Sequence, residues 1–276
     1  TAVGASSQFA ASTGEFNTSL GSLSMGSGIT TGDNNVAVGY NAGLDLTSGA
    51  SNVLVGNIAG GAITTGERNI LIGYAAGNAL VAGSYNIAIG HGALSVEDNN
   101  GSTTAIGYKA LNIQNAGVES YNVAVGHGAA ALLTTAINNT IVGADAGAAI
   151  TTGGNNVALG YDSLGANTIG NSNVAIGKDA MKTNVAADKN VAVGLGTLQA
   201  MTSATTLDTY NTAVGFNAGL AVTTGIYNTL IGGQSGYSLT TGSSNVGVGL
   251  NTLASEDAHG KNTAIGTDVL QTLNAG

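Results

Sequence analysis

The sequence predicts an all-β fold, a parallel β-solenoid, and three observations lead to it. A short motif of Asn, a β-branched residue, a small residue, an aliphatic residue and Gly recurs throughout the 276-residue chain. Apolar residues in this motif alternate with a period of two, which is the period of a strand. The chain has 45 Gly and no Pro, and a solenoid favours this because Pro would remove a backbone N–H that pairs with the next coil.

The repeat sets the number of coils. Twelve of the fifteen spacings between closing glycines are 17 residues, and the others are 18, 19 and 21. Such a unit is too short for a two-helix repeat or a propeller blade. We expect one repetitive segment over 1–276, cut from a longer fibre, with about sixteen coils in a rod about 75 Å long at ~4.8 Å per coil. The closing glycines are Gly4, Gly21, Gly39, Gly56, Gly73, Gly90, Gly107, Gly126, Gly143, Gly160, Gly177, Gly194, Gly215, Gly232, Gly249 and Gly266.

The motif itself is read as a strand with two apolar faces. The residue before the closing Gly is Val, Ile or Leu in every coil, and the residue two before that is Val, Ile or Thr, as in Val38 and Val36. We expect these two positions to stack inside the coil, and the residue between them, Ala in ten coils, to point outward. A strand that is apolar on both faces is buried on both. The Ala face then predicts lengthwise homo-oligomerisation; ordinary surface alanines are the alternative.

A second strand is expected after the closing Gly, and two of its positions exchange volume. Where the fourth residue after that Gly is Gly, as at Gly60, an aliphatic residue such as Ile63 follows three positions later. Where the fourth residue is Leu or Met, the later position is often polar, as in the pairs Leu94 with Glu97, Leu111 with Gln114, Leu164 with Asn167, Met181 with Asn184 and Leu253 with Glu256. Close packing requires such an exchange.

Each coil ends in a turn rich in Thr-Thr-Gly or Thr-Ser-Gly, and an Asn then opens the next coil. The Asn is present in fourteen of the fifteen places where it can be seen, and Thr103 is the exception. Asn adopts the αL conformation readily, hydrogen-bonds its own turn, and can form ladders between stacked coils. We interpret this Asn as structural; a ligand-facing row is the alternative.

The composition argues against several classes of function. Only 8% of the residues are charged, the net charge is -9, and the six basic residues are scattered, so no basic surface is expected to bind nucleic acid. No apolar run approaches the ~18 residues of a membrane span, so we expect no membrane insertion. Without Cys, or any phosphate-loop, nucleophile-elbow or zinc-protease motif, we expect no enzyme, cofactor or metal site. The acidic turns Glu97-Asp98 and Glu256-Asp257 are read as solvated corners, with calcium binding as the alternative.

Two kinds of surface are candidates for recognition. An aromatic row occupies the position after the closing Gly, where rings can cover a coil corner or grip a sugar; its members are Tyr40, Tyr74, Tyr108 and Tyr161, with His91, His127 and Phe216. A second row, Tyr85, Tyr121, Tyr210 and Tyr227, precedes the Asn. The period is broken within 22–34, 108–121 and 195–210, and loops on a rigid scaffold often carry function. The largest insertion predicts a recognition loop of Thr202, Ser203, Thr205, Thr206 and Asp208; neutral drift in a fibre shaft is the alternative.

TTAIGYKAL at 103–111, NVAIG at 173–177 and NTAIG at 262–266 resemble coils of trimeric autotransporter adhesin heads and of phage tail-fibre repeats, over essentially the whole chain. The resemblance implies a left-handed β-roll, three chains side by side as a trimer along the rod axis, and attachment to a host glycan or protein receptor. The 17-residue period is closer to fibre repeats of the NTAIGYQAL kind. We therefore expect an extracellular phage tail-fibre shaft or head on the virion; a bacterial cell-surface adhesin head is the alternative.

Two further hypotheses come from other classes. An ice-binding solenoid would need a continuous Thr array, whereas the Thr turns come in groups such as Thr30, Thr47 and Thr64. A tail-fibre lyase or sialidase would need convergent acidic residues, and no pair stands out among the fifteen.

Overall fold

The computed structural model covers the whole chain and describes residues 1–9, 13–96, 99, 101–203, 205–255 and 257–272. The chain divides into two compact units, Thr1–Asn138 and Asn139–Gly276. Each unit is a parallel β-solenoid, and the described residues contain no helix. This confirms the predicted fold class and its 17-residue period.

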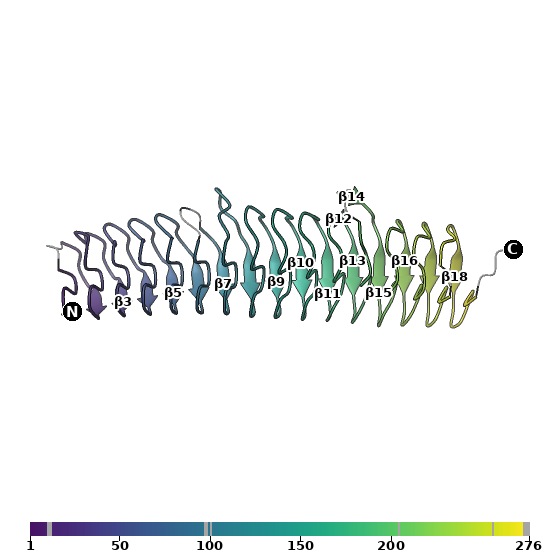
Figure 1. Cartoon of the computed structure of the whole chain (residues 1–276), viewed down its shortest axis with the longest axis horizontal. Coiled ribbons are helices and arrows are strands. Elements are labelled where there is room, and N and C mark those ends of the chain that lie inside the picture. Colours follow the sequence, from purple (N-terminus) through teal and green to yellow (C-terminus); the bar gives the residue numbers. More distant parts are fainter. Residues whose placement is uncertain (10–12, 97–98, 100, 204, 256, 273–276) are drawn as a thin grey trace. The chain divides into compact units, whose positions relative to one another are not determined.

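In the first unit one short strand opens each coil, and each strand pairs in parallel with the next along the chain (Figure 1). The register is one coil, so that Val36 lies opposite Val53 and Ala37 opposite Leu54. The strands are β1 (Ala2–Val3), β2 (Thr18–Leu20), β3 (Val36–Val38), β4 (Val53–Val55), β5 (Ile70–Ile72), β6 (Ile87–Ile89), β7 (Thr104–Ile106) and β8 (Val123–Val125).

The second unit repeats this arrangement and adds a small second sheet. Its main strands are β9 (Thr140–Val142), β10 (Val157–Leu159), β11 (Val174–Ile176), β13 (Val191–Val193), β15 (Thr212–Val214), β16 (Thr229–Ile231), β17 (Val246–Val248) and β18 (Thr263–Ile265). The second sheet consists of β12 (Ala187–Asp188) and β14 (Leu207–Asp208), paired in parallel.

The expected orientation of the strand faces was wrong. The central residue of the strand is the one that points into the coil: Ala37, Leu54 and Ala124 are fully buried. The residues on either side, such as Val36 and Val38, are partly exposed. The same burial pattern recurs along both units. Ala at most strand centres leaves room in the coil interior for a large side chain from the opposite side of the coil. The β-branched residues on either side of each centre therefore stack on the outer face of the strand.

The predicted exchange of volume between two positions inside the coil is confirmed, and a third position takes part in it. Leu111 and Met181 are fully buried, and so is Ile63 in a coil with Gly60. The strand centre also takes part, because a Cβ on Gly77 would lie 2.8 Å from Leu71 Cδ1, and a Cβ on Gly60 would meet side chains from two successive coils. A large strand centre therefore excludes a side chain at the fourth position after the closing Gly. Glu97 and Glu256 lie outside the described residues.

The polar members of this exchange are buried and hydrogen-bonded. The Gly170 amide donates to Asn167 Oδ1 at 2.8 Å, and the Ala187 amide donates to Asn184 Oδ1 at 3.0 Å. Each Asn thereby satisfies a backbone group in the turn three residues ahead, as burial of a polar side chain requires.

The expected second strand is wrong, because that part of the coil consists of turns. Hydrogen bonds from Ala42 N to Gly39 O at 3.4 Å and from Leu46 N to Gly43 O at 3.1 Å close two tight turns. Asn41 and Gly43 have φ values of 54° and 56°, and the αL conformation breaks an extended strand. Pairing between coils continues at alternate residues, for example from Gly43 N to Ala59 O at 3.0 Å.

The Asn that opens each coil forms the expected buried ladder. The Asn52 amide donates to Asn35 Oδ1 at 3.0 Å, which joins successive coils, and Asn52 Nδ2 donates to Gly66 O at 2.8 Å, which ties the start of a coil to its end. Both asparagines are fully buried. The αL residue is the one before the Asn, as with Ser51 at φ 60°, and the Asn itself does not take this conformation. The side chain is occupied by the fold, which confirms the structural interpretation.

Candidate recognition surfaces

The first aromatic row forms a continuous column in the first unit. The ring centroids of Tyr74 and His91 are 4.8 Å apart, those of His91 and Tyr108 are 5.4 Å apart, and those of Tyr108 and His127 are 5.0 Å apart. All four side chains are exposed. Each inner ring, His91 and Tyr108, has a neighbouring ring on both sides, one stacked and one tilted at 33°, so the column presents mainly ring edges and hydroxyl groups to solvent.

The other members of this row stand apart from the column. Tyr40 and Tyr161 are each about half exposed, and Lys178 Nζ lies 5.9 Å from the ring centroid of Tyr161. Tyr40 belongs to the first unit and Tyr161 to the second.

Basic side chains lie over two rings of the second aromatic row. Arg68 Cζ lies 5.3 Å from the ring centroid of Tyr85, and Lys189 Nζ lies 5.3 Å from that of Tyr210. Tyr210 also stacks on Tyr227 at 5.9 Å. These tyrosines take αL φ values, 62° for Tyr85 and 47° for Tyr210, because they occupy the position before the Asn. Exposed cation–π contacts of this kind contribute about 0.5–1 kcal/mol each.

The largest insertion belongs to the second unit and contains β14, which pairs with β12. Thr202, Thr205 and Thr206 are exposed, and Ser203 Oγ donates to Thr205 O at 2.9 Å. The loop is tied to neighbouring coils by hydrogen bonds from Ala186 N to Ser203 O and from Thr209 N to Asp188 O. In Figure 1 this loop, and the loop between β7 and β8, extend beyond the coils beside them. Thr202, Thr205 and Thr206 are thus exposed on a loop whose described ends are hydrogen-bonded to neighbouring coils.

A charged cluster holds the end of this loop. Lys189 Nζ lies 2.7 Å from Asp208 Oδ2, and the Tyr210 hydroxyl donates to the same oxygen at 3.1 Å. The hydrogen bond from Lys189 holds the pKa of Asp208 below its usual value, and the bond to Asp208 raises the pKa of Lys189. Asp208 is therefore bound to Lys189 of the preceding coil and to Tyr210.

Acidic side chains also gather on one coil corner of the second unit. Lys182 Nζ lies 2.8 Å from Asp162 Oδ2 and 3.3 Å from Asp179 Oδ1. The hydrogen bond to Asp162, followed by that to Asp179, raises the pKa of Lys182. Within the described residues no three His, Cys, Asp or Glu side chains are placed to share a metal ion. Of the acidic turns considered for calcium, Glu97, Asp98 and Glu256 lie outside the described residues, and Asp257 is exposed.

The Thr turns join coils. Thr47 Oγ1 donates to Thr64 O at 3.0 Å, and Thr223 Oγ1 donates to Thr240 O at 3.2 Å. The hydroxyl groups of these Thr residues therefore donate hydrogen bonds to the next coil.

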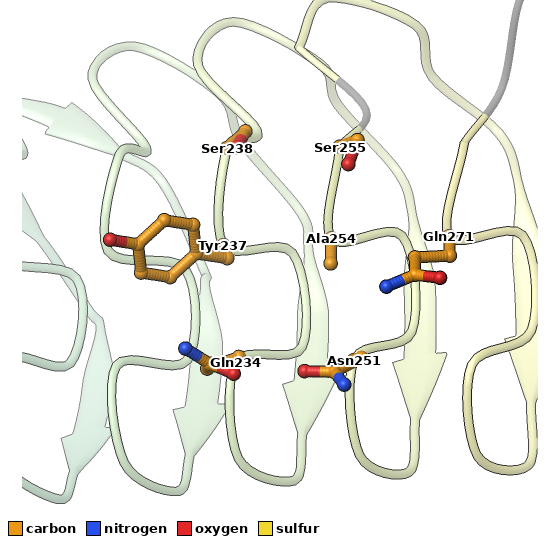
Figure 2. Close-up of a pocket in the computed structure, with 7 residues that line it drawn as sticks. All are labelled: Gln234, Tyr237, Ser238, Asn251, Ala254, Ser255 and Gln271. Atoms are coloured by element: carbon orange, nitrogen blue, oxygen red, sulfur yellow. The ribbon is translucent and has the colours of Figure 1, made fainter.

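Sequence reasoning missed a groove in the second unit, which we call the polar groove. It has a volume of 380 Å³ and runs across three coils: Gln234, Tyr237 and Ser238 come from the first, Asn251, Ala254 and Ser255 from the second, and Gln271 from the third (Figure 2). Ala254 is the small residue between Tyr237 and Gln271, at the same coil position. No motif marks this groove, and the only signal in the sequence is Tyr and Gln on either side of Ala at one repeat position.

No helix capable of crossing a membrane is found in the part of the chain that the structure describes. Neither a family model, nor a curated protein, nor a solved structure matches the chain.

Proposed function

We propose that this chain is a structural and adhesive fibre segment that assembles with copies of itself and mediates attachment to a host surface. The observation that carries the proposal is the outer strand face of each solenoid unit. A surface of this kind is expected to be covered by a partner.

The outer strand face consists of the two β-branched or aliphatic positions of each strand. Ile70, Leu159 and Ile231 on this face are 38%, 45% and 39% exposed. No charged residue occurs in any strand of the main sheet of either unit. Monomeric soluble proteins rarely expose apolar patches larger than a few hundred Å², and this face recurs in coil after coil.

A second copy of the chain is the partner that fits. Its own outer face has the same spacing of ~4.8 Å between coils and the same absence of charge, so two copies can align over many coils. The interface therefore uses the opposite face of the strand from the Ala face that the sequence suggested. A trimer and left-handed coils are what the resemblance to adhesin heads and tail fibres implies.

The same resemblance supports the place of action. An extracellular phage tail fibre, in which this segment is shaft or head, is the leading proposal, and a bacterial cell-surface adhesin head is its alternative. The scarcity of basic residues supports a role without nucleic acid, and the ion pairs that Asp162 and Asp208 make with lysines support a structural role for these two carboxylates.

Light scattering at micromolar concentration and binding to candidate host cells test this proposal together. We expect a trimer that binds cells. A monodisperse monomer would contradict the assembly, and an oligomer that binds no cell would leave a shaft without adhesive function. A variant lacking 202–205, which restores a 17-residue coil, tests the recognition loop: unchanged cell binding would show that the loop is not the site.

A further inference from the structure

The polar groove carries side chains that the fold does not use. The side chains of Gln234, Ser238, Ser255 and Gln271 make no hydrogen bond within the described part of the chain, and neither does the Tyr237 hydroxyl. This differs from the Asn ladder and the Thr turns, where the polar groups join coils. Amide and hydroxyl groups supply donors and acceptors together, and a ligand that carries both kinds of group complements them.

Tyr237 adds an apolar surface to these polar groups. Its side chain is 36% exposed, and no ring or cation contacts it among the described residues. In Figure 2 the ring lies at one end of the groove and extends from its coil to the side away from Ala254 and Gln271. This separates Tyr237 from Tyr108, whose ring lies between those of His91 and His127. Tyr237 therefore has a face available for an apolar ligand surface.

The charge around the groove selects against anionic ligands. None of its seven lining residues is charged. Asp268, the acidic residue nearest to it in the hydrogen-bond network, accepts from Asn251 Nδ2 at 3.0 Å, and the chain carries a net charge of -9. An anionic ligand would meet repulsion without a compensating cation, so a neutral ligand is favoured over an anionic one.

The size of the groove limits the ligand. Three successive coils span about 10 Å at ~4.8 Å per coil, and the volume of 380 Å³ is near the lower end of the ~300–1,000 Å³ typical of ligand sites. This is room for a monosaccharide unit and part of its neighbour. A pyranose ring carries hydroxyls around its edge and an apolar C–H face, which match the amides and the tyrosine ring.

We propose that the polar groove binds a neutral saccharide unit of a surface glycan, with Tyr237 stacking on the sugar ring and Gln234, Asn251 and Gln271 hydrogen-bonding its hydroxyls. This site rests on the proposed adhesive function and locates it on the second unit. It is distinct from the loop at 202–208.

Three variants of the full chain test the site. Tyr237→Ala removes the stacking ring. Ala254→Gln fills the floor of the groove with a side chain that the same coil position already carries at Gln199 and Gln271, so the coil can accommodate it. Gln199→Ala is the matched control, because it changes that position outside the groove. Light scattering confirms that all variants have the oligomeric state of the parent chain before binding is compared.

The probe is a printed array of oligosaccharides that includes neutral hexose and N-acetylhexosamine chains and their sialylated and sulfated forms, followed by calorimetric titration with the best neutral one. We expect neutral glycans to bind, at least about tenfold weaker binding in Tyr237→Ala and Ala254→Gln, and an unchanged Gln199→Ala. Binding of charged glycans alone, or full binding by both groove variants, would overturn the site. A parent chain that binds cells through a protease-sensitive receptor and binds no glycan would overturn it while leaving adhesion intact, whereas a parent that binds neither cells nor glycans would overturn both.

Discussion

Gln114 Oε1 accepts a hydrogen bond from Asn122 Nδ2 at 3.0 Å, and so occupies the place that the Asn of the preceding coil fills elsewhere in the ladder. That preceding position is Thr103, where the Asn is missing. Gln114 Nε2 in turn lies 3.1 Å from Thr103 Oγ1 and 2.9 Å from Ser120 Oγ. The Gln is fully buried, and its side-chain amide takes the place of the missing Asn in the ladder.

Gln114→Ala should therefore destabilise the first unit by about 1–3 kcal/mol, since it leaves buried polar partners unsatisfied. Thr103→Asn in the same chain should recover part of that loss by restoring the ladder residue. Denaturant unfolding of both single variants and the double variant measures the coupling. Additive effects would mean that the two positions do not substitute for one another.

Val123 and Ala124 lie on opposite faces of β8, so substitutions at these two residues distinguish the outer face from the inner face. Ala124→Asp should open the coil locally and cost several kcal/mol, because it places an unpaired charge in the interior. Val123→Asp should leave the coil folded and weaken self-association, because Val123 lies on the partly exposed face. Hydrogen exchange around 123–139 reports the first effect, and light scattering reports the second. The opposite result would restore the Ala face as the interface.

The closing glycines should tolerate no side chain. Gly73 has φ +132°, and an added Cβ would lie 2.6 Å from Gly90 O in the next coil, so Gly73→Ala must displace a backbone. Gly117, in the loop between β7 and β8, has φ +71° and nothing within 4 Å of an added Cβ. Gly117→Ala should cost only about 1–2 kcal/mol. Thermal unfolding should show the larger loss in Gly73→Ala, and equal losses would contradict the close approach of the coils.

The interior exchange can be tested by moving volume across one coil. Leu71→Ala should cost about 2–5 kcal/mol through the cavity it leaves, and Gly77→Leu alone should overpack. With Leu80 unchanged, the double variant approximates the combination of Ala192, Leu198 and Met201 found in a later coil, so its unfolding free energy should exceed that of either single variant. A double variant no more stable than Leu71→Ala would show that the two positions do not share a space.

The Lys189–Asp208 pair should make the loop at 202–208 sensitive to pH at both extremes. The folded pKa of Asp208 is lowered from 3.8, so its contribution is present above that value and is lost as the pH falls through the lower folded pKa. The pKa of Lys189 is raised from 10.5, so its contribution is present below that value and is lost as the pH rises through the higher folded pKa. Faster amide exchange at Thr209 should accompany each loss, and Asp208→Asn should remove the acidic limb. An unchanged acidic limb in that variant would contradict the pairing.

The repeat made the solenoid predictable, because a fixed spacing of Asn and Gly has few structural interpretations. The direction of the strand faces was not, since Ala37 between Val36 and Val38 is compatible with burial on either side. Only the volume that Leu71 and Gly77 share across the coil settles which side faces in. The polar groove was missed for a related reason: Tyr237, Ala254 and Gln271 become neighbours only when three coils are stacked, and no local motif marks them.

The shared interior volume limits how such a chain can change its length. The space above Gly60 is filled by Leu54 and Leu71 of successive coils, so a coil is fitted to the particular coil that follows it. Recombination that deletes or duplicates one 17-residue unit keeps the register but changes which interior side chains meet across the junction. Changes in length should therefore be tolerated at junctions between coils with Ala centres, such as those of β10 and β11, and should be rejected next to Leu54, Leu71 and Leu230.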